Sequence, residues 1–395
     1  MAPTIIAKQG RRLSADKLGV LITFVAAAAW VLLPFAAFRA NRIVLGEGRT
    51  IFESLPMIEA LFVSIVIALA IAVAFYKTPT LWRLLVSLLA LAVLLVFVGR
   101  SGTYLTPEGN SYARVSPASG FWVLIFAFAL MATDALTRMK LKPWPRIGLL
   151  VLVAIALAAL LLSGDWNSLS VMKEYASRAD SFWREAQTHV LLAFGSLFAA
   201  VVVGVPLGIV CHAHKRTRTV VLNILNAVQT IPSIALFGLL IAPLGWVAAN
   251  LPGAAAIGIS GIGVAPALVA LFFYSLLPVV ANTVVGLLGV PEGANDAARG
   301  MGMTDRQRLW GVELPLAFPV ILTGIRIVLV QNIGLATIAA LIGGGGFGVF
   351  VFQGIGQTAM DLVLLGAIPT VMLAFAAAVV LDALVEMVSF GGRTA

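Results

Sequence analysis

The stretch that decides the fold runs from Pro291 to Pro315 and has the sequence PEGANDAARGMGMTDRQRLWGVELP. It is a long polar interruption between two apolar runs, residues 262–288 and 315–342, each long enough to cross the hydrocarbon core of a bilayer. Charged groups are costly to bury in lipid. The chain is therefore expected to leave the membrane here and to enter it again.

Within this stretch the residues predict two short helices with a bend between them. Asp296 is expected near a helix N-terminus, where a carboxylate complements the helix dipole. Gly300 and Gly302 supply the bend, and Thr304 with Gln307 has the spacing of a capping box for a second helix. Such an elbow can fit a groove of a soluble partner. The alternative is a solvated loop that only joins two membrane helices.

The spacing of the small and apolar residues in the elbow is specific. The positions that fit the pattern EAA-x3-G-x9-I-x-L-P are Asp296, Ala297, Ala298, Gly302, Val312, Leu314 and Pro315. This pattern resembles that of the permease subunits of ABC importers, with Asp296 in place of the usual Glu. The resemblance implies that these residues, Val312 aside, couple the permease to a separate ATPase. ATP and Mg would then be bound by that partner, and no cofactor is expected on this chain.

The composition indicates that most of the chain lies in lipid. Apolar residues make up 61% of the 395 residues and charged residues 11%, which is typical of a polytopic membrane protein. The net charge of +9 does not indicate a nucleic-acid partner, because the basic residues lie in short gaps between apolar runs. The single cysteine, Cys211, excludes an internal disulfide, and with three histidines no metal site is expected.

Ten apolar runs predict an all-α membrane protein with about ten transmembrane helices. They cover residues 18–38, 57–76, 81–99, 120–137, 147–163, 187–211, 219–244, 262–288, 315–342 and 365–388. The chain divides accordingly into an N-terminal five-span region (1–163), a connector (164–186) and a permease domain (187–390) that contains the coupling loop 291–315. The connector carries Trp166 and Trp183, so it is expected at the outer membrane surface.

Alternate gaps between the runs differ in basic charge. If the gap before the third run is taken as residues 77–83, which includes Arg83, then 17 of the 26 Lys and Arg residues lie in the two end segments and every second gap. Another 8 lie in the other gaps, and Arg326 lies within a run. Because Lys and Arg concentrate on the cytoplasmic side of membrane proteins, both termini and the elbow are expected in the cytosol. An ATPase could reach the elbow there.

A narrower resemblance covers most of residues 187–390. It is carried by QTIPSIAL (229–236), YSLLP (274–278), Asn282-Thr283, Gly324-Ile325-Arg326 and GGGGFG (343–348). These segments resemble the permeases of bacterial ABC importers for glycine betaine, choline and related quaternary amines, although a Gly-Ala-Gly-Gly pattern is usual at 343–346. The extra N-terminal spans resemble the longer permease subunit of some osmoprotectant systems.

That resemblance implies a C-terminal core of five helices in the bacterial inner membrane. It also implies the partners: two ATPase subunits, a second permease that is either identical or a shorter paralogue, an extracytoplasmic solute-binding protein, and membrane lipid.

The segment QTIPS predicts a helix broken within the membrane, because Pro232 lacks a backbone donor and clashes with the preceding turn. Broken helices at membrane depth are tolerated where they line a cavity. The candidate translocation path consists of Gln229, Thr230, Pro232, Ser233, Tyr274, Asn282 and Arg326. The alternative is a packing kink in which Thr230 and Ser233 bond to their own backbone.

Two further features of the second half are predicted. Arg326 lies about 16 Å along a helix from Pro315, near mid-membrane; it either repels cations as a gate or pairs with a carboxylate or carbonyl. GGGGFG lacks the Lys and Ser or Thr of a phosphate-binding loop, so a flexible outer loop beneath a binding protein is expected.

These observations favour a non-enzymatic permease subunit that imports a quaternary-amine osmoprotectant. A stand-alone ion-coupled carrier is the first alternative, because an Asp with Arg326 could couple protons. An intramembrane enzyme is the second, and its candidate acids are Asp134, Asp361, Asp382 and Glu386. These acids are scattered and have no His or Cys partner at a catalytic spacing.

Overall fold

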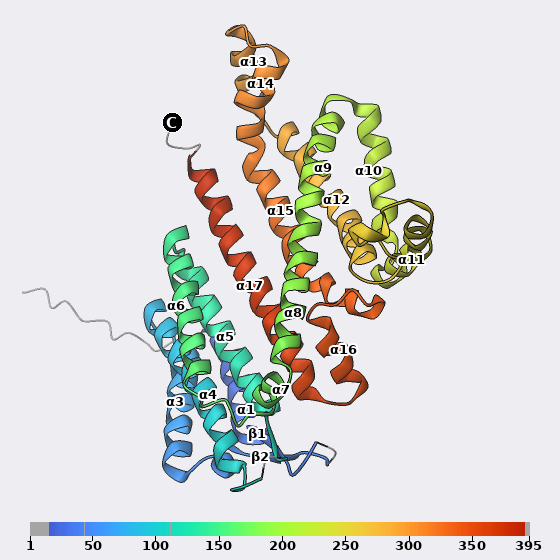
Figure 1. The fold of residues 1–395 in the computed structure, drawn as a ribbon. Coiled ribbons are helices and arrows are strands. Elements are labelled where there is room, and N and C mark those ends of the chain that lie inside the picture. Colours follow the sequence, from blue (N-terminus) through green and yellow to red (C-terminus); the bar gives the residue numbers. More distant parts are fainter. Residues whose placement is uncertain (1–15, 43, 111, 392–395) are drawn as a thin grey trace, which may run out of the picture. The chain divides into compact units, whose positions relative to one another are not determined.

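The computed structural model describes residues 16–42, 44–110 and 112–391. The chain forms two compact helical units, shown in Figure 1. The first comprises Met1–Leu141 and Ala154–Lys173, and the second comprises Lys142–Val153 and Glu174–Ala395.

Four long helices form the core of the first unit. Its elements are α1 (Lys17–Leu32), β1 (Ala36–Arg39), β2 (Glu47–Arg49), α2 (Ile51–Ser54), α3 (Met57–Phe75), α4 (Thr80–Leu105), β3 (Arg114–Pro117) and α5 (Ser119–Met139). Two helices, α6 (Pro143–Leu162) and α7 (Ser170–Ser177), have residues in both units. In the core, α1, α3, α4 and α5 form a ring in which each helix packs against two others. The first helix ends at Leu32 and not at residue 38, because Leu33 precedes Pro34 and is extended.

The two ends of the first unit are closed by different contacts. At one end β1 pairs antiparallel with both β2 and β3, so the gap after α1 meets the gap after α4. Trp166 joins this unit as well, because its indole N–H donates to the carbonyl of Leu95 on α4 at 2.8 Å. Trp166 is therefore anchored to α4, and its position at the membrane surface stays a prediction.

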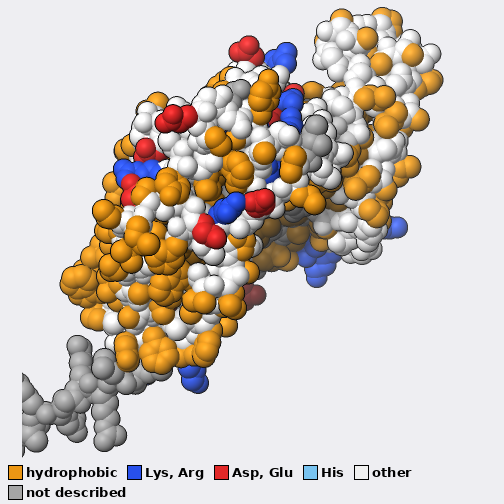
Figure 2. Space-filling model, turned by 90° about the horizontal axis from the view of Figure 1, so that it is seen from below, with side chains coloured by type: hydrophobic (Ala, Val, Ile, Leu, Met, Phe, Trp, Pro, Cys, Tyr) orange, Lys and Arg blue, Asp and Glu red, His pale blue; other side chains and the backbone are white. Residues whose placement is uncertain are grey.

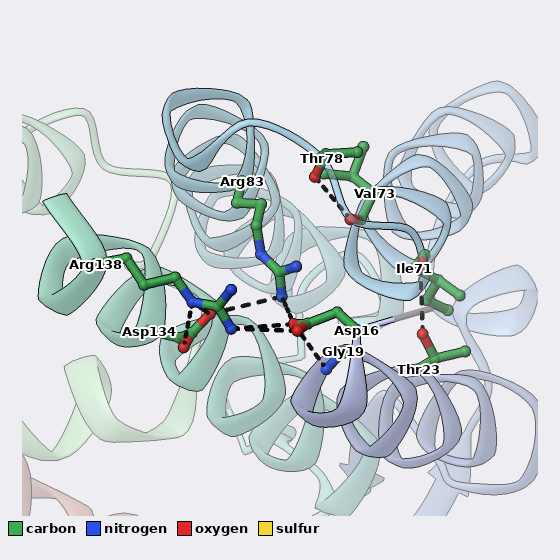
Figure 3. Close-up of polar contacts among 9 residues, drawn as sticks. All are labelled: Asp16, Gly19, Thr23, Ile71, Val73, Thr78, Arg83, Asp134 and Arg138. Atoms are coloured by element: carbon green, nitrogen blue, oxygen red, sulfur yellow. Dashed lines mark hydrogen bonds and ion pairs between the residues drawn. The ribbon is translucent and has the colours of Figure 1, made fainter. Parts of the chain in front are cut away.

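A cluster of two aspartates and two arginines closes the other end (Figure 3). Arg83 on α4 is 1% exposed, and its guanidinium lies 2.9 Å from the carboxylate of Asp16 and 3.7 Å from that of Asp134. Arg138 contacts the same two carboxylates at 3.2 and 2.9 Å. Asp16 also caps α1 by accepting the Gly19 N–H. The cluster therefore ties together the ends of α1, α4 and α5.

We expect Asp16→Asn to destabilise the first unit by about 3 kcal/mol at neutral pH, because it leaves Arg83 buried with less compensating charge. Burial alone would raise the pKa of Asp16, but Arg83, Arg138 and the Gly19 N–H outweigh it and lower this pKa below its ordinary 3.8. The stabilisation is therefore fully present above pH 3.8 and is lost as the pH falls through the lowered pKa.

Thermal unfolding in detergent between pH 3 and 8 measures this effect. Glu59→Gln is the matched control, because it breaks the exposed pair with Arg100 and should cost less than about 1 kcal/mol. The stabilising role of ionised Asp16 would be contradicted if the difference in unfolding temperature between Asp16→Asn and the unmodified protein stayed constant down to pH 3.

The second unit contains the elbow and the broken helix. Its elements are α8 (Ala179–Val190), the π-helical turn η1 (Leu191–Gly195), α9 (Ser196–Ala213), α10 (Lys215–Thr230), α11 (Ser233–Asn250), the 3₁₀ turn η2 (Ala255–Ile257), α12 (Val264–Leu288), α13 (Glu292–Gly300), α14 (Asp305–Arg308), the π-helical turn η3 (Leu309–Glu313), α15 (Leu314–Ala336), the 3₁₀ turn η4 (Ile338–Ile342), α16 (Gly348–Gly356) and α17 (Met360–Gly391).

Helix α12 lies at the centre of the second unit. It packs against α9, α10, α11 and α15, while α17 packs against α15 and α16. A Cβ on Gly204 of α9 would lie 2.8 Å from Val279, and one on Gly208 would lie 2.5 Å from Thr283. Glycines at these two positions thus let α9 approach α12 closely, as small residues do between membrane helices.

The structure confirms an all-α membrane protein with about ten spans. Among the described residues, nine helices are long and apolar enough to cross a bilayer, and α1 is a shorter apolar helix. Hydrophobic side chains cover wide areas of the face drawn in Figure 2. The predicted run 219–244 is a broken helix, as expected from Pro232: it is divided between α10 and α11, and of these two only α11 is by itself long and apolar enough to cross a bilayer.

The predicted connector does not end where a helix begins. From Ala179 to Ala213 the chain is one continuous helical segment of 35 residues, formed by α8, η1 and α9. The helix therefore starts within the range 164–186 that was assigned to the connector.

Candidate functional site

The elbow consists of two short helices joined by a tight turn, as predicted. Helix α13 ends in a Schellman motif: the Met303 N–H donates to the Ala298 carbonyl at 3.1 Å, and the Gly302 N–H donates to the Arg299 carbonyl at 2.9 Å. Gly302 has φ +80°, a left-handed conformation that favours glycine. The capping box of Thr304 with Gln307 then starts α14.

One expectation about the first elbow helix is wrong. Glu292 and not Asp296 occupies its first turn, because α13 begins at Glu292. Asp296 instead lies in mid-helix and pairs with Arg299 at 3.6 Å. Ala298 is 1% exposed and packs within this chain, whereas Ala297 is exposed. The exposed face of α13 therefore includes Asp296 and Ala297 but not Ala298.

The second half of the elbow is anchored by buried charges that the sequence analysis missed. The Arg308 guanidinium lies 2.8 Å from the carboxylate of Glu313, and both side chains are largely buried. Arg308 also pairs with Asp305 at 3.0 Å, and His212 at the end of α9 lies 4.0 Å from Glu313. Leu314 packs in the adjoining apolar cluster, and Pro315 lies in the first turn of α15. The elbow is thus fixed to both α9 and α15.

The predicted break at Pro232 is present and is held against α12. Helix α10 ends at Thr230, Ile231 is extended, and α11 starts at Ser233. The Gln229 amide donates to the Tyr274 carbonyl at 2.8 Å, and the Tyr274 hydroxyl donates to the Ile231 carbonyl. Tyr274 is buried, so it braces the break and does not face an open path.

The other residues of the break divide between the two interpretations. The Thr230 hydroxyl donates to the Ala227 carbonyl at 2.7 Å, which is the local bonding expected of a packing kink. Thr230 and Pro232 are exposed and Ser233 is half-buried. These three positions therefore remain the accessible part of the break.

We expect Tyr274→Phe to destabilise the second unit by about 1 to 3 kcal/mol, because the Ile231 carbonyl loses its side-chain donor away from water. Thermal unfolding in detergent measures the loss. The control is Thr230→Val, whose hydroxyl bonds only to the preceding turn and whose loss should cost less than about 0.5 kcal/mol. Equal unfolding temperatures for the two variants would show that Tyr274 does not brace the break.

The structure does not bring all the predicted path residues together. The Asn282 amide on α12 donates to the Pro278 carbonyl at 2.8 Å. Its side chain packs against Gly324 on α15, where an added Cβ would lie 2.6 Å from Asn282. Arg326 pairs with Asp382 on α17. This ion pair favours the interpretation of Arg326 as a structural partner over that of a repulsive gate.

The four acids that an intramembrane enzyme would need are engaged in local contacts. Asp134 belongs to the cluster of Figure 3, and Arg146 pairs with both Asp382 at 3.0 Å and Glu386 at 2.7 Å. Asp361 accepts the N–H of Leu362. Within the described residues no group of three or more His, Cys, Asp and Glu side chains could hold a metal ion.

A buried polar triad at the centre of the second unit was also missed. The Asn332 amide on α15 donates to Ser196 on α9 at 2.9 Å and to Ser275 on α12 at 2.8 Å. All three side chains are at most 1% exposed. Each residue is a polar position within a largely apolar run, and that was the available signal; the sequence did not show that the three positions meet.

The glycine-rich segment 343–348 is fixed to α8, where a flexible loop was predicted. Gly343, Gly345 and Gly346 have positive φ. The Gly346 N–H donates to the Glu185 carboxylate at 2.6 Å, and the Phe347 N–H donates to Nδ1 of the buried His189 at 3.4 Å. These two bonds explain why the segment is a defined turn.

Two family models match the chain. Residues 16–172 match the ABC transporter permease YehY, N-terminal domain, and residues 200–391 match the binding-protein-dependent transport system inner membrane component. Residues 173–199 separate the two matches, and they include the end of the connector, α8 and the start of α9.

Proteins similar to this chain include named import permeases. The osmoprotectant import permease protein OsmW of Salmonella typhimurium is 45% identical over 186 residues, which are 47% of this chain and 81% of that protein. OsmY of the same organism is 41% identical over 52% of this chain and 79% of that protein. The choline transport system permease protein OpuBB of Bacillus subtilis is 38% identical over 47% of this chain and 78% of that protein. A chain of the inward-facing MetNI methionine ABC transporter is 25% identical. The match covers 53% of this chain and 96% of that chain, with a TM-score of 0.44.

Proposed function

Because the chain belongs to the binding-protein-dependent inner-membrane permeases of ABC importers, we propose that it forms the path by which a small quaternary-amine osmoprotectant enters the cell. The chain itself is the transport subunit and not the ATPase. The solute class follows from the relatives, whose names specify osmoprotectants and choline, and one further relative is named for glycine betaine, carnitine and choline.

The observation that carries the proposal is the elbow. Helices α13 and α14 form a folded, anchored projection whose exposed face includes Asp296, Ala297 and Met301, while Ala298 faces inward. An ATPase subunit would bind this face and would itself hold ATP and Mg. Hydrolysis would move the elbow, and the anchoring of Arg308 and Glu313 would pass that movement to α9 and α15.

The proposed path runs past the break between α10 and α11. Thr230, Pro232 and Ser233 are its accessible residues, while Gln229 and Tyr274 hold the break in position. Two permease chains, identical or one a shorter paralogue, would enclose the path between them, and an outer solute-binding protein would deliver the solute.

The proposed orientation places both termini and the elbow in the cytosol. It rests on the 17 basic residues of one set of segments against the 8 of the other. Single cysteines in a Cys211→Ser background should react with an impermeant reagent added outside at Asn167 and at residues 245–261, but not at Thr304. Labelling of Thr304→Cys from outside would overturn the orientation and the docking of the ATPase.

Uptake into proteoliposomes tests the function. The permease is reconstituted with its co-purified partners, and accumulation of radiolabelled glycine betaine and choline is followed with ATP enclosed on the elbow side. Uptake should require ATP and the binding protein. Uptake driven by a proton gradient through the permease alone would favour the ion-coupled carrier, and absence of an ATPase from the co-purified proteins would contradict the proposal.

A further inference from the structure

An apolar groove runs along the second unit between α9 and the segment formed by η3 and α15. It has a volume of about 730 Å³, and all its lining residues are apolar. Its walls include Val205, Ile209 and Val210 on one side and Leu309, Trp310 and Phe318 on the other. Trp310 is 64% exposed and Phe318 44%. Apolar side chains of this size and exposure are suited to contact with hydrocarbon.

The length of the groove fits one leaflet of a bilayer. Its wall on α9 extends from Val201 to Val210, which is about 14 Å at 1.5 Å per residue. One leaflet contributes about 15 Å of hydrocarbon. The groove ends at the elbow, so the leaflet concerned is the one on the elbow side.

Unpaired positive charge lies at the elbow end of the groove. Arg306 precedes Trp310 by four residues, so it lies one helical turn beyond the groove on the same face. On the other wall, α9 is followed by α10, whose first turn carries Lys215 and Arg216. All three side chains are exposed, and no ion pair to them occurs in the described part of the chain.

The two walls are close at this end. His212, which lies three residues before Lys215, is 4.0 Å from Glu313, the residue before the groove residue Leu314. Glu313 itself is engaged by Arg308. The acidic charge at the end of the groove is thus compensated internally, while the three basic side chains remain available.

We propose that this groove binds one phospholipid with an anionic headgroup. One acyl chain lies in the groove against Val210 and Phe318, and the phosphate and headgroup bind Arg306, Lys215 and Arg216. The identification of the leaflet as cytoplasmic rests on the proposed orientation, but binding itself does not depend on which solute is carried. Each basic side chain near a membrane surface favours anionic lipid about fivefold.

The test uses the purified permease in phosphatidylcholine vesicles that contain phosphatidylglycerol brominated on its acyl chains. Bromine quenches nearby tryptophan, so the fluorescence lost is compared between the unmodified protein and Trp310→Phe to isolate the signal of Trp310. We expect quenching of Trp310 to be half-maximal at a brominated phosphatidylglycerol fraction several-fold lower than with brominated phosphatidylcholine. No transport is required, so failure here is distinct from failure of the proposed function.

Matched variants separate the groove from general contact with lipid. Val210→Trp fills the groove, whereas Val202→Trp places the same bulk on the exposed side of α9, outside the groove lining. Retention of phosphatidylglycerol by the purified protein, measured by native mass spectrometry, should fall with Val210→Trp and not with Val202→Trp. Arg306→Gln should reduce the preference for phosphatidylglycerol about fivefold. Arg299→Gln, which removes an arginine paired with Asp296, should leave it unchanged.

Two results would overturn the proposal. Equal quenching by the two brominated lipids would mean that the groove takes hydrocarbon without regard to the headgroup. Absence of quenching, together with loss of a permease dimer in Val210→Trp but not in Val202→Trp, would assign the groove to a second copy of this chain.

Discussion

Replacing Gly302 by Val should lower ATP-driven uptake at least tenfold while the assembled complex still hydrolyses ATP. Gly302 has φ +80°, and a Cβ there would meet nothing within 4 Å, so the expected effect comes from the backbone and not from a clash. A β-branched residue in this conformation costs on the order of 1 to 3 kcal/mol. The turn would relax, the Schellman bonds would be lost, and α14 would be misdirected.

Gly300→Val is the matched control for this prediction. A Cβ at Gly300 also meets nothing within 4 Å, and Gly300 does not have a positive φ. Uptake and ATP turnover are measured in the same proteoliposomes, with subunit association followed by co-elution. Wild-type uptake in Gly302→Val, or equal loss in both variants, would show that the shape of the elbow is not what couples the two activities.

Asn332→Asp should lower the unfolding temperature of the permease by about 6 to 12 °C. The change places an acid where three buried side chains meet, at a cost of about 3 kcal/mol, and a domain of this size loses about 2 to 4 °C per kcal/mol. Asn332→Ala should cost nearly as much, because it removes two hydrogen bonds and leaves a cavity between α9, α12 and α15.

The control for the triad is Asn226→Asp, which makes the same chemical change at an exposed position of α10 and should alter the unfolding temperature by less than about 2 °C. Thermal unfolding in detergent and in nanodiscs gives the comparison. If Asn332→Asp and Asn226→Asp unfold at the same temperature, the triad does not hold the three helices together.

Local sequence signals predicted the elbow well. Gly302, Thr304 and Gln307 act through bonds that span only a few residues, so their spacing determines their geometry. The burial of Ala298 could not be predicted in this way, because it depends on how α13 folds back on η3, and no spacing along the chain records that contact.

Long-range polar contacts account for most of what the sequence did not show. The sequence allowed two interpretations of Arg326, and its pairing with Asp382, 56 residues away, favours the structural one. Tyr274 was expected to face a path because it shares a helix face with Asn282, yet its hydroxyl reaches back to Ile231 across the break. In each case the chemistry of the side chain was evident, and its partner was determined only by helix packing.

The continuous helix from Ala179 to Ala213 constrains how this chain can change in length. Glu185 near its start holds Gly346, and His212 near its end lies beside Glu313. Each end of the helix therefore contacts a different part of the second unit. One residue deleted between them would rotate one end by about 100° relative to the other and shorten the helix by about 1.5 Å. Both anchors could not then be kept. The π-helical turn at Leu191–Gly195 accommodates one extra residue per turn, so it is the place where such a change could be absorbed. Insertions and deletions should therefore be confined to this turn or to positions outside the two anchors.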